Sequence, residues 1–296
     1  MLRFDTSPIS FPGLGIEVNP SEGFFIGNFE IKWYAVIIAC GMLLAVFYAM
    51  RRCKEFGLTS DDIYNIVLIG IPSAIIGARA YYVIFEWEHY FGAGIPWYKC
   101  LMIRDGGLAI YGGVIGAVLS AMIYCLTSKR RRSKLLPYLD IAGLGLLIGQ
   151  AVGRWGNFFN REAHGGETES FLRMGLIEGG RQIYVHPTFL YESVWNLIGL
   201  LLLHFLSKKR KFDGQVFLYY LAWYGLGRAF IEGLRTDSLY IGSFRVSQLL
   251  AAVTCLVSVG ILLYMLAFKR PDPKAMLVNR AAASAQETAE EDLSKE

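Results

Sequence analysis

Residues 141–162 read IAGLGLLIGQAVGRWGNFFNRE, and this stretch decides how the chain folds. Its first half is apolar except for Gln150 and predicts a membrane span or a buried helix. Its second half adds polar side chains at the end of that run, among them Arg154, Asn157, Asn160 and Glu162. Charge at membrane depth is costly and usually functional, so the stretch predicts a site inside a membrane. The alternative is an interfacial cap in which the arginine reaches out to lipid headgroups.

The composition of the 296-residue chain excludes an ordinary soluble domain. Apolar residues make up 54% and aromatic residues 14%, and the mean hydropathy is +0.39, above typical globular values. The five cysteines have no paired spacing and the four histidines have no zinc-site spacing, so we expect neither disulfides nor a metal. The sequence also contains no nucleic-acid motif, and we expect no nucleic-acid partner.

Seven segments are apolar and about 18–25 residues long, enough to cross roughly 30 Å of hydrocarbon. They are residues 33–50, 61–85, 107–127, 137 into the opening stretch, 187–206, 215–234 and 246–268. We therefore predict an all-α polytopic membrane protein with seven transmembrane helices in residues 1–268. The polar, glycine-rich residues 160–186 predict a small extramembrane head between spans four and five. The Ala/Glu/Ser-rich residues 269–296 predict a disordered tail.

Four basic clusters orient these spans. They follow spans one, three, five and seven, and read RRCK (51–54), KRRRSK (129–134), KKRK (208–211) and KR (269–270). Loops after odd-numbered spans share one side, and basic loops mark the cytoplasmic side. We therefore expect the tail to be cytoplasmic, and the N-terminus and the head at residues 160–186 to face the outer side of the membrane.

Span six carries charged residues along one helical face. Tyr224, Arg228, Glu232 and Arg235 are spaced by four, four and three residues, which places them in one stripe. The simple alternative is an ion pair between Arg228 and Glu232 that satisfies itself within the helix. One positive charge then still needs a partner from elsewhere.

The opening stretch repeats this pattern, because Gln150, Arg154 and Asn157 share a face if the helix continues through two glycines. Two spans would then each present an arginine at similar depth. Guanidinium groups match phosphate oxygens in a bidentate fork, and a phosphate inside a membrane belongs to a phospholipid. Bound headgroups without chemistry would need the same residues, so the pattern alone leaves catalysis open.

Further polar residues lie near the outer ends of other spans. Tyr34 opens span one, and Tyr111 lies early in span three. Glu192 shares a face of span five with Asn196, and we expect it to be either a structural partner of an arginine or a part of the site. For Arg79, near the end of span two, outward snorkelling is one of two readings.

The pattern G-R-x-G-N-F-x-N-x-E at residues 153–162 resembles the signature of the prolipoprotein diacylglyceryl transferase family. Residues 105–113, 186–192 and 224–235 are similar to the other motifs of that family and follow in the same order. The resemblance covers about residues 25–268. It implies a seven-span enzyme of the bacterial cytoplasmic (inner) membrane.

By this resemblance, the chain transfers the diacylglyceryl group of phosphatidylglycerol to the lipobox cysteine in the signal peptide of a prolipoprotein, releases glycerol 1-phosphate and needs no cofactor. The resemblance implies that Arg154 and Arg228 handle the phosphate as catalytic residues. Tyr111 stands where many members carry a histidine, and we expect its hydroxyl to orient the donor. The residues implied to shape the donor site are Tyr34, Asn157, Asn160, Glu162, Gly165, Tyr224, Glu232 and Arg235.

The implied chemistry suits arginines. A cysteine thiol must lose its proton before it can displace the phosphate, and nearby positive charge favours the thiolate. The departing phosphate gains negative charge, which preoriented guanidinium groups stabilise. The rival function is a phospholipid or anion transporter that uses the same arginines and leaves lipid and peptide covalently unchanged.

Overall fold

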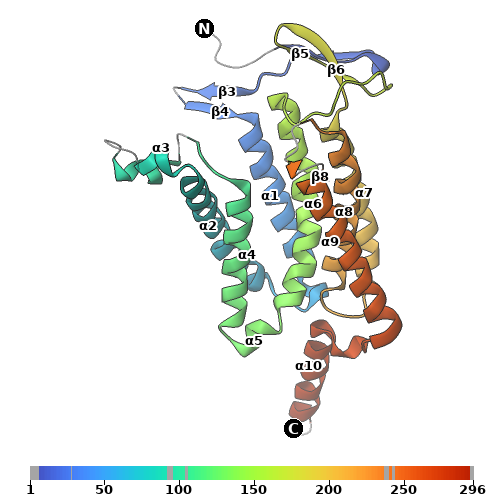
Figure 1. Cartoon of the computed structure of the whole chain (residues 1–296). Helices are drawn as coiled ribbons and strands as arrows, with labels where there is room; N and C mark the ends of the chain where they lie inside the picture. Colours follow the sequence, from blue (N-terminus) through green and yellow to red (C-terminus); the bar gives the residue numbers. More distant parts are fainter. Residues whose placement is uncertain are drawn as a thin grey trace.

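The computed structural model describes residues 7–27, 29–91, 96–103, 106–236, 240–241 and 244–293 (Figure 1). The longer helices in these residues are α1 (Trp33–Arg52), α2 (Ser60–Phe85), α4 (Ile110–Leu126), α6 (Leu135–Asn160), α7 (Thr188–Ser207), α8 (Gln215–Ile231), α9 (Val246–Leu263) and α10 (Leu277–Leu293). Shorter helical pieces are η1 (Pro12–Leu14), η2 (Cys53–Phe56), α3 (Trp87–Phe91), η3 (Trp97–Leu101), α5 (Lys129–Arg132), η5 (Glu232–Leu234), η6 (Tyr264–Lys269) and η7 (Pro273–Ala275). The chain is largely helical, as predicted. Asp105, which opens the second motif, lies outside the described residues.

Five of the described helical segments are long and apolar enough to cross a membrane. They are Trp33–Phe56, Ser60–Phe85, Leu135–Asn160, Thr188–Ser207 and Val246–Lys269. Helices α4 and α8 match two further predicted spans but have 17 residues each. Large apolar side chains on the membrane helices are exposed, for example Leu68 of α2 at 73% and Leu256 of α9 at 71%. Such exposure suits contact with lipid. The structure therefore confirms the prediction of a polytopic membrane protein.

Helix α6 is the centre of the bundle and packs against α1, α7 and α8, while α9 packs on α8. Leu144 and Leu147 of α6 are fully buried and meet Leu203 of α7 and Val216 of α8 in one apolar core. The start of α8 is fixed by Asp140 of α6, whose carboxylate accepts the backbone N–H groups of two residues at that start. These contacts hold the two helices that carry the predicted arginines in a fixed relation.

Helices α2 and α4 form a separate hairpin beside this bundle (Figure 1). A Cβ atom added to Gly77 would lie 2.4 Å from the carbonyl oxygen of Gly112, and one added to Gly116 would lie 2.3 Å from that of Ser73. Only glycines allow such an approach, which is a common way to pack helices in membranes. The pair is therefore held together by backbone contact rather than by interlocking side chains.

Three small sheets lie at the end of the bundle where α1 begins (Figure 1). The first has the antiparallel order β2-β1-β5-β6, from β1 (Ile9–Phe11), β2 (Ile16–Val18), β5 (Met174–Glu178) and β6 (Arg181–Val185). The others are hairpins of β3 (Gly23–Ile26) with β4 (Phe29–Lys32), and of β7 (Tyr240–Ile241) with β8 (Phe244–Arg245). The all-α prediction is wrong for these segments, because strands of two to five residues are too short to show a clear alternation of apolar and polar residues. The pairing of β1 with β5 also joins Ser10 to Gly175, beyond the reach of local sequence patterns.

Residues 277–293 form α10, although the composition predicted a disordered tail. Alanine, leucine and glutamate are strong helix formers, and the helix is anchored at its start. The backbone N–H of Leu277 donates to the Asp213 carboxylate at 2.8 Å, and Met276 is buried. The start of α10 is thus attached to the bundle at the end opposite the β-sheet, and the rest of the helix extends away from it (Figure 1).

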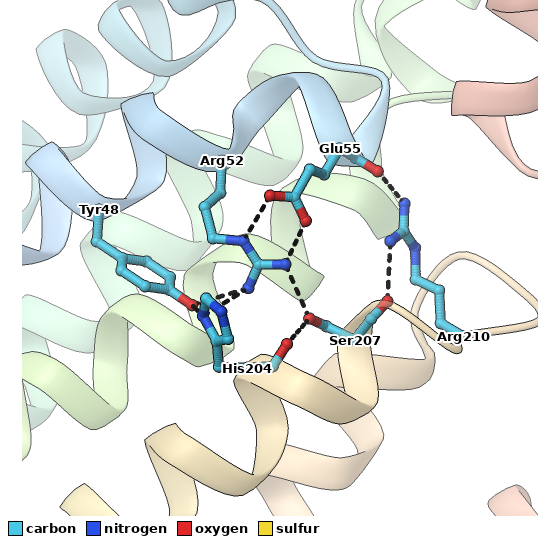
Figure 2. A network of polar contacts seen from close by, with 6 residues as sticks. All are labelled: Tyr48, Arg52, Glu55, His204, Ser207 and Arg210. Atoms are coloured by element: carbon cyan, nitrogen blue, oxygen red, sulfur yellow. Dashed lines mark hydrogen bonds and ion pairs between the residues drawn. The ribbon is translucent and has the colours of Figure 1, made fainter.

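A network of polar contacts joins the end of α1 to the end of α7 (Figure 2). Its members, here called the Arg52 network, are Tyr48, Arg52, Glu55, His204, Ser207 and Arg210. Two of them belong to the basic clusters that were predicted to end spans, yet Arg52 is 4% and Arg210 is 9% exposed. Arg210 donates to the backbone carbonyls of Ser207 and Glu55 and lies over the ring of Phe56. These two arginines are therefore packed inside the protein rather than solvated at the membrane surface.

Candidate active site

The two predicted arginines meet on one carboxylate. The Nη2 atom of Arg154, on α6, lies 2.7 Å from Oε2 of Glu192 on α7, and the Nη1 atom of Arg228, on α8, donates to Oε1 of Glu192 at 2.8 Å. Glu192 is 3% exposed. The faces inferred from residue spacing therefore converge, and the reading of Glu192 as a partner of arginine is confirmed.

Two more charged residues extend this group. Oε2 of Glu232, at the end of α8, lies 2.6 Å from Nη2 of Arg228, so the predicted ion pair between these two residues also exists. Arg235 lies 3.7 Å from Glu192 and 3.9 Å from Glu232. We call these five residues, Arg154, Glu192, Arg228, Glu232 and Arg235, the arginine–glutamate cluster.

The arginine–glutamate cluster has a surplus of positive charge, because three guanidinium groups face two carboxylates. Arg245 adds to the surplus by donating to the backbone carbonyl of Glu232 at 2.5 Å. Among the described residues, Arg154 contacts Asn157 and Glu192, and Arg228 contacts Glu192 and Glu232. A guanidinium group has five N–H donors, so both arginines keep donor capacity for an anion.

The end of α6 turns back so that its polar side chains form a second layer beside Arg154. Glu162 accepts from the amides of Asn157 at 3.0 Å and Asn160 at 3.2 Å, and Asn157 in turn accepts from Arg154 at 3.3 Å. The turn is made by Arg161, whose φ of 53° lies in the left-handed region. The predicted residues of the opening stretch are thus brought together.

Tyr34, at the start of α1, lies against the same end of α6. Its ring fills the space next to Gly156, where an added Cβ atom would be 2.6 Å from a ring carbon. A glycine at position 156 is therefore needed for Tyr34 to pack against the end of α6.

Gly165 joins the head to the end of α8. Its N–H donates to the carbonyl of His186, and the N–H of Gly166 donates to the carbonyl of Leu234, both at 2.9 Å. A Cβ atom on Gly165 would lie 2.7 Å from Cβ of His186 and 2.9 Å from the Leu234 carbonyl oxygen. Gly165 thus lets the head lie directly beside Arg235, with which it forms a β-bridge.

Tyr224 lies one helical turn before Arg228, as its spacing predicted. It lines a small cavity together with Glu192, Asn196 and Arg228. Asn196 is 1% exposed, and its Oδ1 atom has no hydrogen-bond partner in the part of the chain that the structure describes. The cavity therefore borders the two central ion-pair residues and a buried amide.

Tyr111 lies on a different pair of helices from the two arginines. It lies at the start of α4, is 59% exposed, and its ring centroid is 6.4 Å from that of Tyr81 on α2. Helix α4 packs against α2 rather than against the helices that carry the arginines. Among the described residues, Tyr111 is therefore a neighbour of α2 rather than of the helices that carry the arginines.

Arg79 is a polar residue whose placement the sequence left open. Its side chain does not snorkel outward but is buried at 6% exposure, over the ring of Tyr90. It donates to five backbone carbonyls of the segment before α4, those of Lys99, Cys100, Met102, Gly106 and Gly107. Arg79 therefore shapes the approach to the helix that carries Tyr111, and no local sequence signal indicated this.

Comparison with known proteins agrees with the motifs. The sequence model of the prolipoprotein diacylglyceryl transferase family matches residues 22–264. A Clostridium botulinum (strain Langeland) protein named phosphatidylglycerol–prolipoprotein diacylglyceryl transferase is 49% identical over 242 residues, covering 80% of this chain and 93% of the relative. A Bacillus cereus (strain G9842) protein of the same name is 46% identical over 246 residues, covering 79% and 87%.

Proposed function

We propose, because the chain belongs to the prolipoprotein diacylglyceryl transferase family, that it transfers the diacylglyceryl group of phosphatidylglycerol to the lipobox cysteine of prolipoproteins. The reaction forms a thioether, releases glycerol 1-phosphate and is the first step of bacterial lipoprotein maturation. The observation that supports this most directly is that Arg154 and Arg228 share Glu192 between three apolar helices and keep donors for a phosphate.

The mechanism follows from the charges. The donor phosphodiester carries one negative charge and binds where the arginine–glutamate cluster has positive surplus, with forks from Arg154 and Arg228 on its oxygens. The cysteine thiol gives up its proton to water, and the thiolate sulfur forms a bond to the glycerol carbon of the diacylglyceryl group. The bond from that carbon to the phosphate oxygen breaks and its electron pair leaves with glycerol 1-phosphate.

The arginines act most strongly as this bond breaks. The leaving phosphate gains a second negative charge, and donors already aimed at it stabilise that charge without reorganising. Glu192 provides this orientation, because it holds both guanidinium groups from a buried position on a third helix. Glu232 and Arg235 complete the arrangement from the end of α8.

The remaining predicted residues are assigned to the donor site. Tyr34, Asn157, Asn160 and Glu162 form the layer beside Arg154, Gly165 brings the head to Arg235, and Tyr224 flanks Arg228. Tyr111 orients the donor through its hydroxyl from the α2–α4 hairpin. A phosphatidylglycerol molecule lying between the hairpin and the bundle would contact both sides at once.

We also assign seven spans, with α4 and α8 as the two shortest. The N-terminus and residues 160–186 lie on the periplasmic side of the inner membrane, and α10 lies in the cytoplasm. The support is that the basic clusters gather at the end of the bundle that carries α5 and α10 (Figure 1). A cysteine placed at Glu178 in the β5–β6 turn should react with an impermeant maleimide in intact spheroplasts. Labelling only after membrane disruption would show that the proposed orientation is wrong.

The function is tested with purified protein in liposomes that contain phosphatidylglycerol and a lipobox peptide. We expect the peptide mass to rise by one diacylglyceryl group and glycerol 1-phosphate to appear in equal amount. A peptide whose cysteine is replaced by serine is the control and should stay unmodified. Movement of lipid across the bilayer with an unchanged peptide mass would support the transporter, which the family membership does not favour.

A further inference from the structure

Helices α7 and α8 are joined by two tryptophans that bind each other's backbone. The indole N–H of Trp195 donates to the carbonyl of Trp223, and the indole N–H of Trp223 donates to the carbonyl of Trp195, both at 3.0 Å. The two rings stack with centroids 4.4 Å apart and an interplanar angle of 17°. Both indole donors are thus satisfied inside the bundle, where water is scarce.

Each indole also lies on a glycine of the opposite helix. A Cβ atom on Gly199 would lie 2.2 Å from Nε1 of Trp223, and one on Gly227 would lie 2.2 Å from Nε1 of Trp195. No other residue fits at either position without displacing an indole. These four residues, which we call the tryptophan clasp, therefore form a reciprocal lock with one allowed register between α7 and α8.

The register matters because the clasp adjoins the central ion pair. Gly227 directly precedes Arg228, and Trp195 follows Glu192 by three residues, about one helical turn. Trp195 and Gly227 line the same small cavity as Glu192 and Arg228. A shift of α8 by one residue moves its side chains by about 1.5 Å along the axis and rotates them, which breaks the 2.8 Å contact between Arg228 and Glu192.

We propose that Trp195 and Trp223 are positioning residues for diacylglyceryl transfer, which set the height of Arg228 against Glu192 and so against the donor phosphate. This inference rests on the proposed function. The tryptophans act through Arg228 and do not touch the reacting atoms. A clasp that served only to hold the helices together would affect stability and leave the turnover of folded protein unchanged.

The first test replaces each tryptophan by phenylalanine, which keeps an aromatic ring and removes the indole N–H. We expect Trp195→Phe and Trp223→Phe each to lower kcat about tenfold, because small misplacements of a catalytic group have large effects on rate. KM for the lipobox peptide should stay within about twofold of wild type. Trp97→Phe is the control, since Trp97 is 68% exposed on η3, and it should keep the wild-type kcat.

Two glycines of α8 separate register from general packing. A Cβ atom on Gly225 would lie 2.7 Å from the carbonyl oxygen of Ala251 on α9, so Gly225→Ala strains α8 on the face away from the clasp. Gly227→Ala strains it at the clasp itself. We expect both to lower the thermal midpoint in detergent, and only Gly227→Ala to lower kcat per folded molecule. An equal fall of kcat in both variants would overturn the inference.

A double-mutant cycle with Glu192→Gln tests whether the clasp acts through the ion pair. We expect Trp223→Phe to cost about tenfold in the wild-type background and less than about twofold in the Glu192→Gln background. The same factor in both backgrounds, or full kcat in both phenylalanine variants of an active protein, would overturn this inference alone. A wild-type protein that leaves the peptide unmodified would overturn the proposed function and this inference with it.

Discussion

Helix α7 carries a buried carboxylate near one end and a buried serine at the other, and each belongs to a different group of arginines. At the second end, Arg52 directs all five N–H donors at protein groups: the Glu55 carboxylate twice, Tyr48, His204 and Ser207 (Figure 2). At the first end, Arg154 and Arg228 have two partners each among the described residues. The side chains of Arg52, Arg154 and Arg228 are 5%, 21% and 17% exposed. All three are largely buried, so burial alone does not distinguish a functional site from a structural one.

The difference lies in how completely the forks are satisfied. A guanidinium group whose donors all end on hydroxyl, carboxylate and imidazole groups of the protein has nothing left for a ligand, so the Arg52 network is structural. The arginine–glutamate cluster instead has a surplus of positive charge and N–H donors that remain available for a ligand. It lies beside the polar layer of Asn157 and Glu162. Whether every N–H donor of a guanidinium group has a partner within the protein therefore distinguishes a structural arginine from one that can bind phosphate. Substitutions at the two ends of α7 can test this distinction.

The largest effect is expected at the arginines of the arginine–glutamate cluster. Lysine keeps the charge and loses the fork, so Arg154→Lys and Arg228→Lys should each lower kcat by about 10²–10³, as loss of a donor to a developing anion does elsewhere. The measurement is lipobox-peptide turnover in liposomes, with membrane insertion checked by extraction. Near-normal turnover in either variant would show that its arginine has only a structural role, like Arg52.

A smaller loss is expected when the shared carboxylate is neutralised. Glu192→Gln keeps the side-chain shape but removes the charge that orients both guanidinium groups, and we expect kcat to fall about 10–100-fold. The thermal midpoint in detergent should also fall, because uncompensated buried charge is strongly destabilising. Glu167→Gln, on the exposed head, is the control and should change neither quantity. Full activity with a lowered midpoint would show that Glu192 stabilises the bundle only.

Tyr111 sharpens the comparison because it belongs to neither group of arginines. If its hydroxyl orients the donor, Tyr111→Phe should lower kcat about tenfold, while Tyr111→His, which still offers a hydrogen bond, should stay within about threefold of wild type. Turnover is measured across pH 6 to 9 in the same liposomes. Wild-type activity of the phenylalanine variant over that range would reduce Tyr111 to an aromatic packing residue beside Tyr81.

The smallest effect on activity is expected in the Arg52 network. Arg52→Lys removes several of the five hydrogen bonds and should destabilise the protein by about 2–4 kcal/mol, since each lost bond to a buried partner costs about 1 kcal/mol or more. Activity below the new thermal midpoint should remain within about twofold of wild type. Arg51→Lys, at an exposed neighbouring position, is the control. A large loss of kcat in Arg52→Lys would contradict the separation between the two ends of α7.

Local patterns in the sequence predicted much of the arginine–glutamate cluster. The four-and-three spacing on α6 and α8 placed Arg154 and Arg228 on inward faces, because helix periodicity links residue number to direction. The same spacing could not identify Glu192 as the shared partner, since that depends on how α7 is turned between the two. The position of Tyr111 near the outer end of its span, together with the family resemblance, grouped it with the arginines, whereas α4 packs on α2 through glycines.

The sequence by itself determined the membrane helices, the basic ends of the spans and the family, because hydropathy, charge and motif order are properties of the linear chain. Only the tertiary structure decided that Arg52 and Arg210 are buried, that β1 pairs with β5, and that Trp195 and Trp223 clasp each other. The physical reason is the same in each case. These features join residues far apart in the chain, and a hydrogen bond between such residues leaves no periodic trace in either segment.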